Sequence, residues 1–139
     1  MDRTLVICKP DAVARGLAGE IISRFERRGL CIAAMELRRL DEDTLARHYA
    51  EHVGKAFYGD LVAFMSSGPV VTLAVEGPQD TFEVVRTMMG ATNCRKADPG
   101  TIRGDLGIDF TQNLIHGSDS AESAVRELDI FFPGLAQSS

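Results

Sequence analysis

The sequence predicts an α/β chain of the α+β sandwich class, with a ferredoxin-like βαββαβ arrangement, an antiparallel four-stranded sheet and added helices. Three observations predict this class. The length of 139 residues suits one domain. Short runs rich in β-branched residues alternate with segments of helical period, and their order makes two strand-helix-strand units. We therefore expect one domain over residues 1–139, with helices packed on a face of the sheet.

Four apolar runs are expected to form the strands. Three of them are rich in β-branched residues and are bounded by proline, glycine or charged residues, as strands commonly are. The fourth is a shorter apolar run that precedes the last helix. The expected strands span residues 4–8, 31–37, 70–75 and 113–115.

Apolar side chains recur every three or four residues between and after these strands, which indicates helices with one buried face. Glycine follows several of these segments and is expected to end them. Asp119 and Glu122 have the spacing of a capping pair at the start of the last helix. The expected helices are 18–25 before Gly29, 42–49, 57–65 before Gly68, 82–89 before Gly90, and 120–130.

Residues 90–112 follow no clear period and contain four glycines and one proline. A compact domain rarely keeps so long an irregular stretch unless that stretch binds something. The segment from Arg86 to Arg103 holds four basic residues and one acidic residue, whereas the rest of the chain holds eleven basic and nineteen acidic residues. These basic residues are either solvated or arranged for phosphate, whose oxygens match the arginine fork.

The overall composition excludes several classes of protein. With 45% hydrophobic and 25% charged residues, the chain is too apolar for disorder. Its apolar runs are much shorter than the about 20 residues of a membrane span. The net charge of −5 opposes general binding to nucleic acid or to anionic membranes. Because no secretory signal pattern is evident, we expect a cytoplasmic protein with no membrane partner and no dedicated nucleic-acid binding.

The three cysteines have no metal-ligand spacing. Cys8 and Cys31 lie in apolar runs and are expected to be small core residues. Cys94 lies in the polar, glycine-rich stretch and is expected to be exposed.

His116 is the first candidate for chemistry, because it follows an apolar strand and precedes Gly117, Ser118 and a helix start. A helix start favours an anion such as phosphate beside the ring. A neutral imidazole can act as a nucleophile near pH 7. Glu127, about two turns into the helix, is placed to hold one ring nitrogen and leave the other free. The alternatives are a surface-loop histidine and a solvated helix carboxylate.

Lys9 ends the first strand, where Pro10 and Asp11 stop it. It is either exposed or a point charge on a phosphate, and no Walker-type glycine-rich loop lies near it. The aromatic residues Tyr49 and Phe57 supply either core or ligand-contact surface. No metal site built from protein ligands alone is evident, whereas a phosphate-bound Mg²⁺ needs at most one carboxylate.

Residues 113–120, Asn-Leu-Ile-His-Gly-Ser-Asp-Ser, closely resemble the active-site signature of the nucleoside diphosphate kinase family in its bacterial type. That signature is an Asn, two variable residues and His-Gly-Ser-Asp. The similarity covers nearly the whole chain, in the family's order. Further matching segments are residues 4–12, 68–70, 99–105 and 122–124.

The resemblance implies transfer of the γ-phosphate of a nucleoside triphosphate, such as ATP or GTP, to a nucleoside diphosphate. The implied ping-pong mechanism forms a pros-phosphohistidine at His116, with broad base specificity. Glu127 matches the carboxylate that orients His116, and Ser118 matches a serine beside it. Glu51 matches a carboxylate near Mg²⁺, the implied cofactor. Positions matching phosphate and ribose contacts are Lys9, Tyr49, Arg86, Thr92, Arg103 and Asn113, and positions matching base contacts are Phe57, Leu61 and Phe110.

The resemblance also implies a homo-oligomer, with a hexamer favoured over a tetramer. Two other functions compete with the enzyme. A regulatory or interaction protein of this fold that binds without turnover is expected to lack His116 or Lys9, and both are present. The second alternative, a ligand-sensing module unrelated to phosphate, does not explain the presence of the His-Gly-Ser-Asp segment. The sequence therefore favours the kinase.

Overall fold

The computed structural model of the chain describes residues 1–135. Its four strands form one sheet in the order β2-β3-β1-β4, and every neighbouring pair is antiparallel. This confirms the ferredoxin-like arrangement. The strands are β1 Asp2–Cys8, β2 Cys31–Arg38, β3 Val70–Gly77 and β4 Ile115–Gly117.

The five expected helices are all present, and two further short helices accompany them. The first follows Lys9, because a proline at the first helical position costs no hydrogen bond. The second lies within the stretch expected to be irregular, where the Thr101 hydroxyl accepts from Gly104 N–H and caps the helix. The helices are α1 Pro10–Ala14, α2 Ala18–Arg27, α3 Glu42–His48, α4 Tyr58–Met65, α5 Thr81–Met89, α6 Ile102–Leu106 and α7 Ala121–Phe131, with a 3-10 turn η1 at Ala50–His52.

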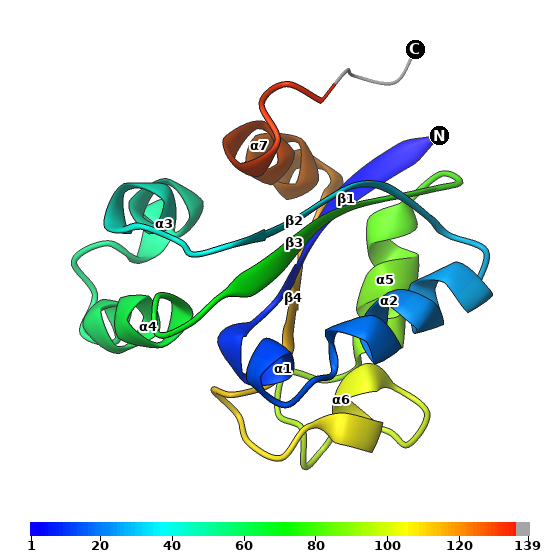
Figure 1. Cartoon of the computed structure of the whole chain (residues 1–139), viewed down its shortest axis with the longest axis horizontal. Helices are drawn as coiled ribbons and strands as arrows, with labels where there is room; N and C mark the ends of the chain where they lie inside the picture. Colours follow the sequence, from blue (N-terminus) through cyan, green and yellow to red (C-terminus); the bar gives the residue numbers. More distant parts are fainter. Residues whose placement is uncertain (136–139) are drawn as a thin grey trace.

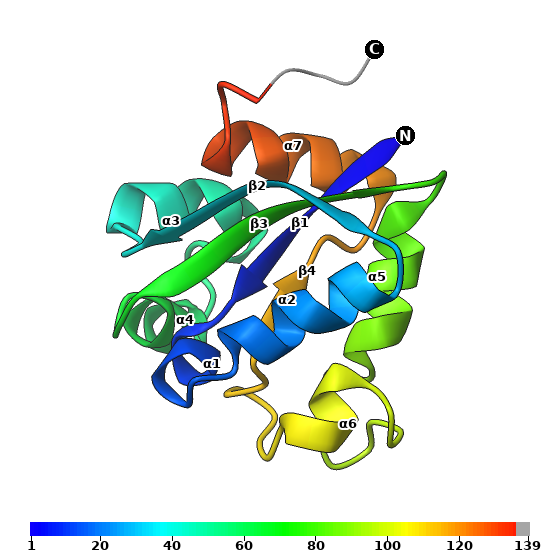
Figure 2. The same cartoon turned by 45° about the vertical axis from the view of Figure 1, so that its right-hand side comes forward.

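Helices cover both faces of the sheet, which corrects the expectation that they pack on a face (Figures 1 and 2). One face carries α2 and α5, with α1 and α6 near its edge, and the other carries α3, α4 and α7. Alternate residues of β1 supply the two cores, because successive side chains of a strand point to opposite faces. Val6 and Cys8 pack on the α2 side, and Leu5 and Ile7 pack on the α7 side.

The fourth strand begins two residues later than predicted. Leu114 has a left-handed φ of 76°, so extended pairing with β1 cannot begin before Ile115. His116 therefore lies inside β4, opposite Ile7, rather than in the loop after it.

The last helix is capped differently from the expectation. Ser120, not Asp119, is the N-cap residue, and its hydroxyl accepts a hydrogen bond of 3.0 Å from Ser123 N–H. The extended backbone of Ser120 aims its short side chain back at the first turn.

The cysteine expectations are confirmed at one position and wrong at two. Cys8 is buried, as predicted. Cys31 is exposed because it begins the edge strand β2. Cys94 is buried, since its Sγ packs so closely against Gly107 that a side chain there would collide with it.

No helix within residues 1–135 is long and apolar enough to cross a membrane.

Candidate active site

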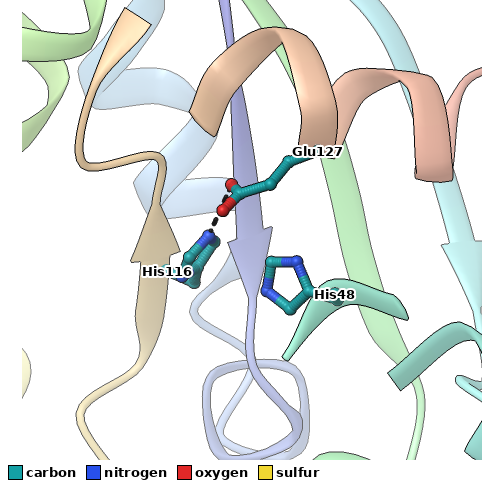
Figure 3. Close-up of side chains that lie close together, drawn as sticks. All are labelled: His48, His116 and Glu127. Atoms are coloured by element: carbon teal, nitrogen blue, oxygen red, sulfur yellow. Dashed lines mark hydrogen bonds and ion pairs between the residues drawn. The ribbon is translucent and has the colours of Figure 1, made fainter. Parts of the chain in front are cut away.

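The β4 strand and the α7 helix bring His116 and Glu127 together (Figure 3). His116 Nε2 lies 2.9 Å from Glu127 Oε1, and Ser118 Oγ donates to the same oxygen at 2.7 Å. Within the described residues, no hydrogen bond engages Nδ1 of His116. The geometry therefore fixes the tautomer with the proton on Nε2 and leaves a lone pair on Nδ1.

Glu127 is kept as a carboxylate although it is buried. Burial acts to raise its pKa, but the hydrogen bond from His116, the charge of a protonated ring and the Ser118 hydroxyl lower the pKa below its ordinary value. A negative charge beside Nε2 stabilises any positive charge that develops on the His116 ring.

The segment before β4 is held by side chains from distant parts of the chain. Lys9 Nζ donates to Asn113 Oδ1 at 2.7 Å, and Asn113 Nδ2 donates to the Thr92 carbonyl at 3.1 Å. Asp11 Oδ2 accepts from Leu114 N–H at 3.1 Å, beside the left-handed turn. These contacts fix the approach to His116 without a ligand.

Arg103 also holds the segment before β4, through hydrogen bonds to backbone carbonyls. Its guanidinium donates to the carbonyls of Asn113, Gly90 and Ile115 at 3.2, 3.1 and 2.6 Å. Burial and the nearby charge of Arg86 lower its pKa to about 10, so it stays charged at neutral pH. Because a guanidinium carries five N–H groups, two remain for a ligand.

Lys9 is a second cation of the site, and its side chain is partly buried. Burial, and then the charge of Arg103, lower its pKa to about 8. The lysine is therefore mostly charged at neutral pH and loses its proton under mildly alkaline conditions.

A cavity of about 600 Å³ joins these groups to an aromatic mouth. Phe57 and Phe110 are 50% and 60% exposed at this mouth. Tyr49 lies deeper, where burial and then the charge of Glu127 raise its pKa and keep its hydroxyl protonated. Ten predicted site residues line the cavity: Lys9, Tyr49, Phe57, Leu61, Arg86, Thr92, Arg103, Phe110, Asn113 and His116.

The other two predicted site residues line a second cavity, of about 240 Å³. Glu127 lies behind the His116 ring, and Glu51 is exposed on η1. The two cavities adjoin, because His116 and four other residues line both of them.

His48 is the site residue that the sequence analysis missed. Its ring meets the His116 ring edge-on, with centroids 4.7 Å apart. His48 follows Leu45 by three residues on α3, and both are buried. That helical spacing is the signal that places His48 on the buried face of α3.

Comparisons with known proteins identify relatives of the whole chain. The sequence model of the family described as "Nucleoside diphosphate kinase" matches residues 2–136. A nucleoside diphosphate kinase of Streptomyces avermitilis is 62% identical over 95% of this chain and 96% of its own. One from Parafrankia is 54% identical over 97% and 98%.

Solved structures give the same result. A halophilic nucleoside diphosphate kinase from Halobacterium salinarum in complex with CDP superposes with a TM-score of 0.92 at 45% identity, covering 99% of this chain and 93% of its own. A nucleoside diphosphate kinase family protein from Babesia bovis gives a TM-score of 0.93 at 41% identity, covering 100% and 94%.

Proposed function

The chain belongs to the nucleoside diphosphate kinase family, and it is a phosphotransferase that moves the γ-phosphate of a nucleoside triphosphate to a nucleoside diphosphate. We propose that His116 carries the phosphoryl group between the two nucleotides. The observation that carries this assignment is the bond from Nε2 to Glu127, which leaves Nδ1 free beside the 600 Å³ cavity.

In the first half-reaction, the Nδ1 lone pair of His116 attacks the γ-phosphorus. The bond from that phosphorus to the bridging oxygen breaks, and the nucleoside diphosphate leaves with the electron pair. The product is a pros-phosphohistidine, whose ring charge Glu127 balances through Nε2–H. In the second half-reaction, a terminal oxygen of another nucleoside diphosphate attacks the phosphorus and the P–N bond breaks. No proton is gained or lost overall.

The cationic groups of the cavity are suited to the charge of the transferred group. Lys9, Arg86 and Arg103 surround the part of the cavity next to His116, and fixed positive charge of this kind stabilises phosphoryl transfer. Thr92, Asn113 and the protonated Tyr49 add neutral donors for phosphate and ribose oxygens.

The aromatic mouth is suited to any base. Phe57, Leu61 and Phe110 offer stacking surface, and stacking is tolerant of sequence because every base has a π face. This composition supports broad base specificity.

Mg²⁺ fits the site as an ion carried mainly by the nucleotide phosphates. Mg²⁺ prefers oxygen ligands and keeps several waters. Glu51, the predicted carboxylate, lies on η1 and is exposed at the second cavity. Glu51 would hold the ion through a water molecule, and the ion would neutralise part of the negative charge of the phosphates. Asp60, on the wall of the first cavity, is a second carboxylate that the sequence analysis did not predict.

Self-association has a structural basis in β2. Met35 and Leu37 of this strand are 60% and 65% exposed, and within residues 1–135 its outer edge pairs with no strand. An exposed apolar strand edge is a surface for pairing with a second chain. We propose a homo-oligomer, a hexamer rather than a tetramer, of a cytoplasmic enzyme whose single domain spans residues 1–139.

Labelling with γ-³²P-ATP and Mg²⁺ tests the role of His116. We expect wild type to form an acid-labile, base-stable phosphoprotein that passes its label to any nucleoside diphosphate, and His116→Ala to form none. His52→Ala removes a different imidazole of the same cavity and should still become labelled. Equal labelling of His116→Ala and wild type contradicts the assignment, and an unlabelled but nucleotide-binding wild type favours the regulatory alternative.

A further inference from the structure

Three metal-ligand side chains meet around the His116 ring and line the smaller cavity of about 240 Å³. One ligand atom each from His48, His116 and Glu127 lies within 4.8 Å of the other two (Figure 3). They come from α3, β4 and α7, so the fold rather than a local motif assembles them. His48 has no part in the transfer described above.

His48 is buried without a hydrogen-bond partner. Its side chain is only 4% exposed, and neither ring nitrogen has a hydrogen bond within the described residues. Aromatic neighbours surround it, with Tyr49 and Phe131 rings at 4.4 and 5.2 Å. A buried polar atom without a partner costs free energy, so this imidazole is either a defect of the fold or a group that binds something absent from the chain itself.

The donor set selects among metal ions. Two imidazoles and one carboxylate suit Zn²⁺, Co²⁺, Ni²⁺ or Cu²⁺, whereas Mg²⁺ requires oxygen ligands. Two histidines and a glutamate with one open position are a known zinc coordination set. In a tetrahedral site with bonds of about 2.1 Å, neighbouring ligand atoms are about 3.4 Å apart. The 2.9 Å separation of His116 Nε2 and Glu127 Oε1 already approaches this value. The His48 ligand atom lies within 4.8 Å of the other two, so it must approach them by up to about 1.5 Å.

The smaller cavity offers an ion a polar surface next to the cluster. The 240 Å³ polar cavity is lined by all three ligands and by the exposed carboxylates of Glu51 and Asp119. Arg126 opposes a cation, because its Nη2 lies 3.6 Å from Glu127 Oε2. Its side chain is 45% exposed, and its Nη1 also donates to the carbonyls of Arg47 and His48 at 3.2 and 3.5 Å. Metal binding therefore requires that Nη2 move away from Glu127.

We propose that His48, His116 and Glu127 bind one divalent transition-metal ion, of which Zn²⁺ is the best fit, and that the bound ion blocks phosphorylation of His116. Metal binding requires only the three side chains. The block on phosphorylation rests on the proposed role of His116.

The block follows from the proton inventory of the imidazole ring. With Nε2 on the metal, the one proton of the neutral His116 ring must sit on Nδ1. Nδ1 then has no lone pair to attack phosphorus. The proton moves from Nε2 to Nδ1 through solvent, so no net proton is released at this ring. Glu127 is also drawn to the metal and no longer balances charge at Nε2.

A Co²⁺ titration tests the metal site without any assay of activity. Protein freed of metal by chelator and gel filtration is titrated with CoCl₂ in excess MgCl₂, and the visible spectrum reports tetrahedral Co²⁺. We expect saturable, equimolar binding that Zn²⁺ reverses, in wild type and in His52→Ala. We expect binding at least about tenfold weaker in His48→Gln and His48→Ala, because each lacks one ligand.

The variants are chosen so that the result decides the proposal. Circular dichroism checks that each variant is folded, and His48→Gln preserves side-chain volume if His48→Ala does not fold. Absence of saturable Co²⁺ binding in wild type overturns the metal site. So does equal affinity in wild type and folded His48→Gln.

A labelling experiment then tests the block. Each protein is loaded with equimolar Zn²⁺, desalted, and labelled with γ-³²P-ATP and Mg²⁺, beside a metal-free sample. We expect Zn²⁺ to lower the phosphohistidine yield of wild type at least tenfold, reversibly with chelator, and to change the yield of His48→Gln little. Unchanged labelling of Zn²⁺-loaded wild type overturns the block. Failure of the metal-free wild type to label contradicts the proposed function instead, and the Co²⁺ titration still decides the metal site.

Discussion

The cavity that we propose as the nucleotide site has a proposed phosphate end and a proposed base end, and these two ends are built in opposite ways. At the phosphate end, buried groups are already joined by hydrogen bonds, as in the Lys9–Asn113 and His116–Glu127 pairs. At the base end, Phe57 and Phe110 are half or more exposed and form no polar contact with their side chains. The phosphate end therefore has its geometry before a ligand arrives, whereas the base end offers only surface.

This difference assigns a separate task to each end. Pre-positioned charge lowers the barrier to phosphoryl transfer because nothing must reorganise during the reaction. An exposed stacking surface adds affinity that does not depend on which base is bound. Variants at the two ends should consequently change different measurements.

The largest effect is expected at Arg103, on the stability of the phosphate end. Arg103→Ala leaves the carbonyls of Gly90, Asn113 and Ile115 without their donor, so the free energy of unfolding should fall by about 3 kcal/mol. Urea denaturation measures this. Arg86→Ala is the control, because Arg86 is exposed and bonds one carbonyl, and it should cost at most about 1 kcal/mol. A loss of at most about 1 kcal/mol for Arg103→Ala would contradict this role of Arg103.

The next largest effect is expected at Glu127. Glu127→Gln removes the charge that balances the phosphorylated ring while keeping the side-chain shape, and should slow the first half-reaction by on the order of a hundredfold. Single-turnover labelling measures the rate. Ser118→Ala removes only the hydroxyl that positions Glu127, so its loss should be much smaller. A Ser118→Ala effect as large as that of Glu127→Gln would mean that position, not charge, is what Glu127 supplies.

A smaller effect is expected at the base end. Phe57→Ala should weaken ADP, GDP and CDP by a similar factor of about tenfold each, because stacking contributes about 1–3 kcal/mol for any base. The maximal rate of phosphoryl transfer should hardly change. Calorimetric titration of the three nucleotides measures the affinities. A loss confined to one base would contradict the contrast between the two ends.

The smallest effect concerns the pH dependence of phosphate binding. Lys9 has a pKa of about 8 without ligand, and bound phosphate favours its charged form. Nucleotide affinity should therefore fall severalfold as the pH rises from 8 to 9, with proton uptake on binding. The nucleotide phosphates are already ionised there, since their second pKa is about 6. Lys9→Arg stays charged and should show a flat profile, so equal slopes in both proteins would rule out Lys9 as the cause.

The sequence predicts the parts of the fold that repeat with a period. The first three strands and the five longer helices each show several apolar positions at the spacing of a strand or a helix. The α6 helix does not, because its five residues include Gly104 and it is stabilised by the Thr101 cap. The start of β4 depends on the left-handed φ of Leu114, a conformation that no local pattern announces in a leucine.

The candidate site divides in the same way. His116, Lys9 and the basic segment stand out from the residues alone, because they interrupt apolar or acidic surroundings. The base contacts at Phe57 and Phe110 were found through the family resemblance. His48 was missed because its importance lies in which strand α3 packs against, and tertiary packing is not written in the spacing of one helix.

Pairing through the outer edge of β2 would make the stability of the folded chain depend on protein concentration. If copies pair through this edge, unfolding must first separate them, and dilution then favours unfolding by mass action. The melting temperature should climb with protein concentration. At a low cellular concentration the enzyme would be less stable. The edge of β2 would then also be exposed to pairing with other proteins.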